Sequence, residues 1–327
     1  MTCFKFIGVL AFSLFFAAFG ASGVFALSPD TDSCIECHTK PKYKKEDIGK
    51  LKECLSCHGM AGHPYKETAK PLLGSSVAEA SDVRHPVSKG DERKADLKGM
   101  VFIPEGEFIM GTDDRLRDEK PLHVSYAASF YIDKYEVTNA DYKRFVLAAL
   151  YPPPDNWNGS NYPQGKANHP VIFVSWNDAT NYCRFDGKRL PREIEWEKAA
   201  RGIDGRVYPW GDKWNLNNSN NPLRGHNGAM PVGSFEAGKN QYGLYDMSGN
   251  VWEWIDDDYL PHAGSDYVSP EFGARYKILK GGSWWDCMFY GCGISAPTYN
   301  RSFFTADTKN DSFGFRCVAD VSGKDKK

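Results

Sequence analysis

The chain has 327 residues, of which 41% are hydrophobic and 25% charged, and its formal net charge at pH 7 is −2. This composition excludes a polytopic membrane protein, a collagen-like chain and a disordered chain. Because the charges nearly balance, there is no electrostatic case for nucleic acid as a partner. The length leaves room for about two domains of ~100–200 residues each.

The N-terminal residues have the pattern of an export signal. Lys5 precedes an almost wholly apolar run from Phe6 to Phe19, and small residues lead to Val24-Phe25-Ala26, which is similar to a signal-peptide cleavage site. The alternative is a retained anchor, but this run is shorter than the ~20 residues that span a bilayer. The sequence predicts a signal peptide over 1–26 and a bacterial protein that is periplasmic or otherwise exported, with no membrane span after cleavage.

Residues 27–65 contain two copies of a cysteine–histidine motif. Both copies follow the C-x-x-C-H pattern: Cys34-Ile35-Glu36-Cys37-His38 and Cys54-Leu55-Ser56-Cys57-His58. At this spacing two thiols can bond the haem vinyl groups while His38 or His58 reaches the iron as an axial ligand. A zinc ribbon or two disulfides also fit the cysteine spacing, but a four-cysteine zinc site needs no histidine after each pair. The pattern predicts two c-type haems.

Each haem iron also needs a ligand on its opposite face. Candidates are His63, His85 and the thioether of Met60. Met60 follows His58 too closely to reach around the same ring, so we expect bis-histidine ligation by His63 and His85; exposed histidines without a haem role are the alternative. Two haems would form the core of this small, mostly helical or irregular module. Residues 66–99, which include His85, are expected to be a linker.

From Met100 onward the sequence predicts an α+β domain with much irregular structure. Capping-box patterns mark helix starts, glycines mark helix ends, and short apolar runs mark strands. The expected elements, in chain order, are a β-hairpin with strands at 101–103 and 108–111, helices that begin near Thr138, Ser175 and Pro191, and strands at 277–284 and 313–320.

A series of short motifs follows in this domain. They are Ile109-Met110-Gly111, Tyr135-Glu136-Val137-Thr138-Asn139, His169-Pro170-Val171, Gly187-Lys188-Arg189-Leu190-Pro191, Glu195-Trp196-Glu197, Tyr208-Pro209-Trp210-Gly211, Gly243-Leu244-Tyr245-Asp246-Met247, Gly249-Asn250-Val251-Trp252-Glu253-Trp254, Lys280-Gly281-Gly282-Ser283-Trp284 and Gly314-Phe315-Arg316-Cys317. In this order they resemble the sulfatase-modifying-factor family, which includes the formylglycine-generating enzymes. The resemblance implies a C-type-lectin-like fold over residues 100–321, followed by a charged tail at 322–327. It does not by itself imply catalysis, because one fold serves several roles.

The resemblance also implies a cysteine pair that holds copper(I) and activates oxygen. Cys287 and Cys292 keep the family's spacing, and two thiolates suit copper(I) in nearly linear geometry. The residues between them depart from the family, and Ser312 replaces a pocket asparagine, so the substrate pocket is expected to be altered. A local disulfide between the two cysteines is the alternative in an oxidising compartment. The family's pocket residues that are kept are Trp252, Ser283 and Arg301.

The same resemblance also implies a structural disulfide and calcium sites. Cys183 and Cys317 match the family's structural disulfide, which would stabilise the fold by restricting the unfolded chain. A family calcium site uses two carboxylates and two backbone carbonyls, whose hard oxygens suit calcium; a solvated turn is the alternative. Its counterparts here are Asp246, Gly249, Val251 and Glu253. Asn220 and Asn221 match part of a second calcium site, whose downstream aspartate has no clear counterpart.

Together these features predict an exported dihaem cytochrome fused to a formylglycine-generating-type oxidase. The expected partners are a periplasmic electron donor or acceptor and a sulfatase-like protein whose cysteine is converted to formylglycine. An electron-transfer or binding protein with a non-catalytic lectin-like domain is the alternative. A different oxygen-dependent oxidation is a third hypothesis, consistent with a kept copper pair and a changed pocket.

Overall fold

The computed structural model of the chain describes residues 95–285 and 295–321. The predicted haem ligands and the Cys287–Cys292 pair lie outside the described residues. No helix within the described ranges has the length and apolar character needed to cross a membrane.

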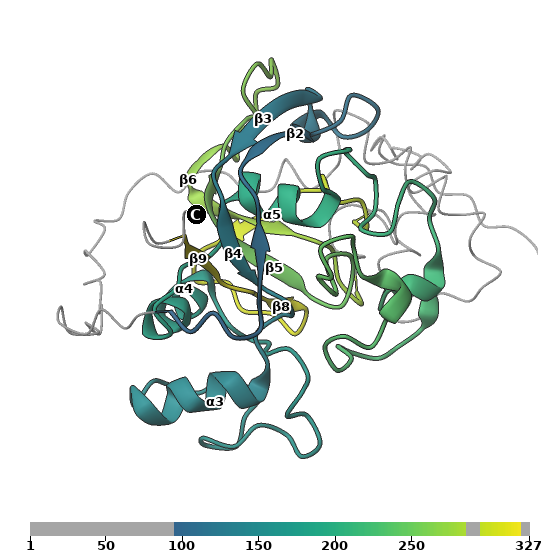
Figure 1. Ribbon diagram of the computed structural model, residues 1–327. Coiled ribbons are helices and arrows are strands. Elements are labelled where there is room, and N and C mark those ends of the chain that lie inside the picture. The colour runs from purple at the N-terminus through teal and green to yellow at the C-terminus, as the bar shows by residue number, and fades with distance from the viewer. Residues whose placement is uncertain (1–94, 286–294, 322–327) are drawn as a thin grey trace, which may run out of the picture.

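The described residues fold into three sheets and three α-helices, with long irregular connections (Figure 1). The sheets have the strand orders β1-β4-β9, β2-β3 and β7-β6-β5-β8. All pairings are antiparallel except that of β5 with β8. The elements are β1 Met100–Ile103, β2 Gly106–Met110, η3 Arg117–Glu119, β3 His123–Ala127, β4 Phe130–Asp133, α3 Asn139–Ala148, α4 Trp176–Phe185, α5 Glu193–Arg201, η4 Leu216–Asn218, η5 Pro222–Arg224, η6 Glu236–Gly238, β5 Trp252–Tyr259, β6 Gly273–Lys280, β7 Ser302–Thr305, β8 Phe313–Gly314 and β9 Val318–Asp320. This architecture confirms the predicted mixture of helices and strands with much irregular structure.

The three α-helices begin close to the predicted residues. Thr138 and Ser175 are the N-caps of α3 and α4, and each hydroxyl accepts from the backbone N–H three residues later in a capping box. The third helix, α5, begins at Glu193, after Pro191, and ends at Gly202 with φ +75°. In Figure 1 α5 lies in the interior of the domain, where it contacts β2, β3, β5 and β6.

The predicted hairpin between the first two strands is wrong. β1 pairs with β4, and β2 pairs with β3. The Nζ of Lys198, which is fully buried on α5, donates to the carbonyls of Pro104 and Gly106 at 2.7 and 2.8 Å. A buried ammonium therefore takes the carbonyls of the connecting turn, and the two strands diverge into different sheets.

Two strand boundaries also differ from the prediction. β6 ends at Lys280, because Gly281 and Gly282 have φ +90° and +73° and leave the extended conformation. The segment predicted as one strand over 313–320 forms β8 and β9, which belong to different sheets. Between them, Arg316 and Cys317 turn inward and are fully buried.

The core consists of two main apolar clusters, one beneath α3 and α4 and one around α5. The first contains the predicted disulfide, which joins Cys183 on α4 to Cys317 across 134 residues. The prediction of this structural disulfide is confirmed.

Candidate functional site

A cluster of buried carboxyl groups lies at the start of β5. It consists of Glu136, Asp246 and Glu253, hereafter the acidic cluster, and the fully buried guanidinium of Arg316 faces it. Arg316 donates to both oxygens of Glu253 at 2.7 Å. Among the described residues, three carboxyl groups thus share this guanidinium.

The acidic cluster has three carboxyl groups facing one guanidinium, and this arrangement shifts the pKa values of Glu136 and Asp246. Burial raises the pKa of Asp246 to about 6, and the charge of Glu253 adds to this. Burial also raises the pKa of Glu136 well above its usual value, as do the charges of Asp246 and Glu253. The mutual repulsion among these carboxyl groups, unlike their burial, marks a negative potential that a bound cation would relieve.

The predicted calcium ligands meet the requirements of the ion only in part. Oδ2 of Asp246 accepts from the Gly233 N–H at 2.7 Å, while Glu253 is already bound by Arg316 and by the indole N–H of Trp196 at 2.8 Å. In the described parts of the chain, no three His, Cys, Asp or Glu side chains converge on a possible metal position. A calcium ion at this loop would therefore depend on backbone carbonyls as well as on Asp246. The negative charge of the acidic cluster suits calcium. Among the predicted ligands, Glu253 fits least, because Arg316 and Trp196 already bind its oxygens.

The two asparagines of the second predicted calcium site are both buried, and they differ in their contacts. Asn220 donates to Gly228 O and to Asn250 Oδ1, but its own Oδ1 has no hydrogen-bond partner. Asn221 Nδ2 donates to Leu216 O and Ser219 O within the same turn. Asn220 therefore presents an open buried acceptor beside the loop that carries Asp246.

Two of the predicted pocket residues lie near this loop. The backbone N–H of Trp252 donates to Ser312 O at 2.8 Å, so the structure brings the kept tryptophan and the substituted serine together. Ser283 follows β6, and its Oγ donates to Trp285 O and accepts from the Trp285 N–H. Trp284 donates its backbone N–H to Asn250 O at 2.9 Å.

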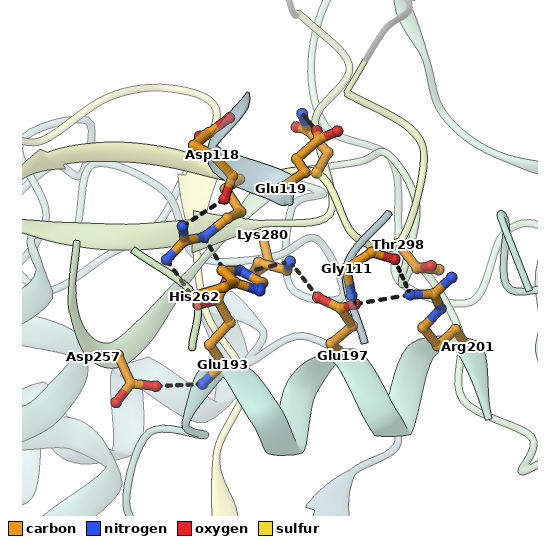
Figure 2. Close-up of polar contacts among 12 residues, drawn as sticks. Gly111, Asp118, Glu119, Glu193, Glu197, Arg201, Asp257, His262, Lys280 and Thr298 are labelled. Carbon is orange, nitrogen blue, oxygen red and sulfur yellow. Dashed lines mark hydrogen bonds and ion pairs between the residues drawn. The ribbon is translucent and has the colours of Figure 1, made fainter. Parts of the chain in front are cut away.

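The third pocket residue, Arg301, belongs to a buried ion-pair network along α5, and Figure 2 shows Glu193, Glu197 and Lys280 of this network. Arg301 donates to both oxygens of Glu193 at 2.7 and 3.0 Å, and Lys280 bridges Glu193 and Glu197 at 3.5 and 3.0 Å. Burial raises the pKa of Glu193, but the charges of Arg301 and Lys280 outweigh burial and hold it well below its usual range. The buried His262 adjoins this network, 3.8 Å from Glu193, and neither ring nitrogen has a hydrogen-bond partner. Arg301 is thus 1% exposed and tied into the interior.

Sequence reasoning missed Glu136 and Asn250 as parts of the site. Asn250 donates to Oε2 of Glu136 at 2.8 Å, and both residues are buried. The only sequence signal was their presence inside the quoted motifs at 135–139 and 249–254. Their contacts join segments far apart in the chain, which no local pattern reveals.

Comparison with known proteins places this geometry in a family. Residues 85–321 match the sulfatase-modifying factor enzyme 1-like domain. The formylglycine-generating enzyme of Mus musculus is 33% identical over an alignment that covers 79% of this chain and 85% of that protein. The formylglycine-generating enzyme of Streptomyces coelicolor is 34% identical, with 70% and 91% covered. An inactive Cα-formylglycine-generating enzyme 2 of Mus musculus is also 34% identical, with 67% and 85% covered.

A solved structure gives the same result for the fold. PvdO from Pseudomonas aeruginosa matches with a TM-score of 0.55 and 28% identity, over 68% of this chain and 94% of that chain. These similarities, together with the disulfide and the motif-bearing loops around the acidic cluster, show that the chain belongs to the sulfatase-modifying-factor family.

Proposed function

We propose that this protein oxidises a cysteine side chain of a sulfatase-like substrate protein to formylglycine, using oxygen and a copper(I) ion held by Cys287 and Cys292. The observation that carries the proposal is the similarity to formylglycine-generating enzymes over most of the chain. It agrees with the sequence spacing of the two cysteines. When bound, copper(I) would supply the activation of oxygen.

The reaction balances only with an added reductant. One cysteine side chain, one O₂, two electrons and two protons give one aldehyde, one H₂S and one water. The thiol carbon supplies two of the four electrons that O₂ needs, so another two must come from a donor. Two haems on the N-terminal module, in a periplasmic protein, would pass them on singly.

The role of the described residues in this proposal is to hold the site rigid. The acidic cluster and the disulfide fix loops that have no regular secondary structure of their own. A framework of this kind is what a precisely positioned metal ion requires.

The haem part of the proposal predicts two covalently bound haems on Cys34 with Cys37 and on Cys54 with Cys57. After export, the intact mass should exceed that of the processed polypeptide by two haem groups. Replacing His63 or His85 by alanine should convert one low-spin haem to high-spin, because it removes an axial ligand. A protein that carries zinc and shows no Soret band would contradict this assignment.

We also propose that calcium binds at the loop 246–253, through Asp246 and the carbonyls of Gly249 and Val251, with Glu253 contributing charge. Linkage then predicts that calcium raises the free energy of unfolding by ~2.7 kcal/mol at a hundredfold excess over its dissociation constant. Thermal unfolding with chelator and with graded calcium measures this effect. The Asp246→Asn variant should lose the calcium dependence. Identical melting of the native protein in chelator and in saturating calcium would contradict the site.

A second candidate function is a non-catalytic binding or electron-transfer role. Two points favour it: a relative of equal identity is an inactive enzyme, and the family resemblance implies that Ser312 replaces a pocket asparagine. In this case Cys287 and Cys292 would form a local disulfide.

Copper(I) titration of the reduced, exported protein, combined with a count of free thiols, separates the two functions. The oxidase proposal predicts that each chain binds one copper(I). Two thiols that titrate as free before copper(I) is added should no longer do so afterwards. Mass mapping that finds Cys287 bonded to Cys292, with no copper uptake after mild reduction, would contradict the oxidase and leave the binding role.

A further inference from the structure

The ribbon formed by β2 and β3 carries a row of exposed apolar side chains. Within the described residues, these two strands pair only with each other. Leu122, just before β3, and Val124 and Tyr126 within it are 48%, 65% and 58% exposed. Because alternate residues of a strand point to the same side, the three side chains form one surface, hereafter the ribbon patch. Rows of this kind are typical of contact surfaces.

The opposite face of the ribbon is already occupied by the core of the domain. Phe108, Met110 and Ala127 are buried together, and Ile194 of α5 packs against them. The ribbon patch takes no part in this cluster, so packing within the domain does not account for its apolar character. In Figure 1 the ribbon lies at the end of the domain opposite α3.

Acidic residues border the ribbon patch. Glu107 is the cross-strand partner of Tyr126, and Glu105 lies directly before β2. Both residues are exposed. A partner that suits this surface combines apolar side chains with positive charge at the rim.

The N-terminal part of this chain has those properties. Residues 27–65, which lie outside the described residues, contain apolar side chains such as Ile48 and Leu51. A segment of about 40 residues buries little of its own apolar surface and gains from a neighbouring one. Between the two cysteine–histidine motifs this segment has only three acidic residues but six lysines, which are Lys40, Lys42, Lys44, Lys45, Lys50 and Lys52.

The length of the connection places this segment within reach of the ribbon patch. β1 begins at Met100 and leads directly into β2, where Ile109 is the cross-strand partner of Val124. At ~3.3 Å per residue, Ile109 is at most about 30 Å from Met100. Residues 66–94, expected to be a linker, would span about 30 Å as a flexible chain. A tether that matches the span gives the highest effective concentration, of millimolar order.

We propose that residues 27–65 dock on the ribbon patch, with their lysines next to its acidic rim. Burial of the apolar row supplies the affinity, and the opposite charges orient the segment. The N-terminal module is then held at one place on the domain rather than at any point that its linker allows. The inference does not depend on the copper chemistry proposed above.

Hydroxyl-radical footprinting of the exported, full-length protein tests the inference, because it measures the solvent exposure of individual side chains. A protease site is inserted after Ser75, and dilute protein is footprinted before and after the cut. We expect the ribbon patch to be protected in the intact chain and its oxidation to rise several-fold on cutting. Leu147 and Leu150, at the end of α3, are 53% and 89% exposed and should be oxidised equally in both samples.

The Val124→Lys variant provides a second test in the uncut chain. Lysine is well tolerated on an exposed strand, and its charge repels the lysines of residues 27–65. Oxidation of Leu122 and Tyr126 should rise several-fold. The matched variant Leu150→Lys, at the opposite end of the domain, should leave their oxidation at the native level.

Equal oxidation of the ribbon patch in intact and cut protein would overturn the inference. Protection that increases with protein concentration would also overturn it, because a second copy of the chain would then cover the patch. An equal loss of protection in Val124→Lys and Leu150→Lys would contradict it too, since the effect would not be specific to this surface.

Discussion

Replacing Arg316 by methionine is expected to lower the free energy of unfolding by about 3–5 kcal/mol, because it leaves an uncompensated buried charge. Arg316 is fully buried, holds both oxygens of Glu253, and also donates to Tyr245 O at 2.9 Å. Without it, the three carboxyl groups of the acidic cluster would repel each other with no neighbouring guanidinium. Chemical denaturation of the variant and the native protein measures the difference.

The control for this prediction is Arg144→Met. Arg144 pairs with Asp141 at 3.3 Å on the surface, where the two side chains are 63% and 44% exposed. Such exposed pairs contribute about 0–1 kcal/mol. A loss below about 1 kcal/mol in Arg316→Met, or an equal loss in both variants, would show that the ion pair with Glu253 is not a main support of the site.

Serine at Cys287 or Cys292 is expected to abolish copper(I) binding and to reduce peptide oxidation to background. Enzymes commonly accelerate their reactions by ~10⁶-fold or more, and the proposal assigns the oxygen chemistry to the ion that these thiolates hold. The haem absorbance should not change, because the proposed haem attachment uses four other cysteines, Cys34, Cys37, Cys54 and Cys57. Copper analysis and mass spectrometry of a cysteine peptide measure the two effects.

The control is the double variant Cys183→Ser, Cys317→Ser. It removes the disulfide that joins α4 to the segment before β9 and should cost about 3–5 kcal/mol of stability in the loop-entropy model. At a temperature where it stays folded, it should still bind copper(I) and oxidise the peptide. If the control variant lost peptide oxidation and the Cys287 and Cys292 variants kept it, the proposal would have named the wrong cysteines.

The sequence predicted those features of the fold that depend on neighbouring residues. The helix starts at Thr138 and Ser175 were correct because a capping box is complete within four residues. The hairpin was wrong because Lys198, far away in the chain, binds the turn carbonyls. The predicted strand at 313–320 forms two strands instead, because Arg316 turns inward between them and binds both oxygens of the buried Glu253.

The candidate site follows the same rule. The family resemblance identified Asp246 and Glu253, and the structure places them together at the start of β5. It did not identify Glu136 or Asn250, which lie 114 residues apart in the chain and contact each other in the fold. The resemblance identified Arg301, but no sequence pattern predicted its ion pair with Glu193. Ion pairing of this kind depends on which elements pack together, which local patterns do not specify.

The most direct test of the proposed activity is mass spectrometry of a cysteine-containing sulfatase peptide incubated with the copper-loaded, reduced protein in oxygen. We predict loss of the thiol and formation of the aldehyde, with two ferrous haems oxidised for each aldehyde formed. An unchanged peptide, from protein shown to hold one copper(I) and two reduced haems, would contradict it.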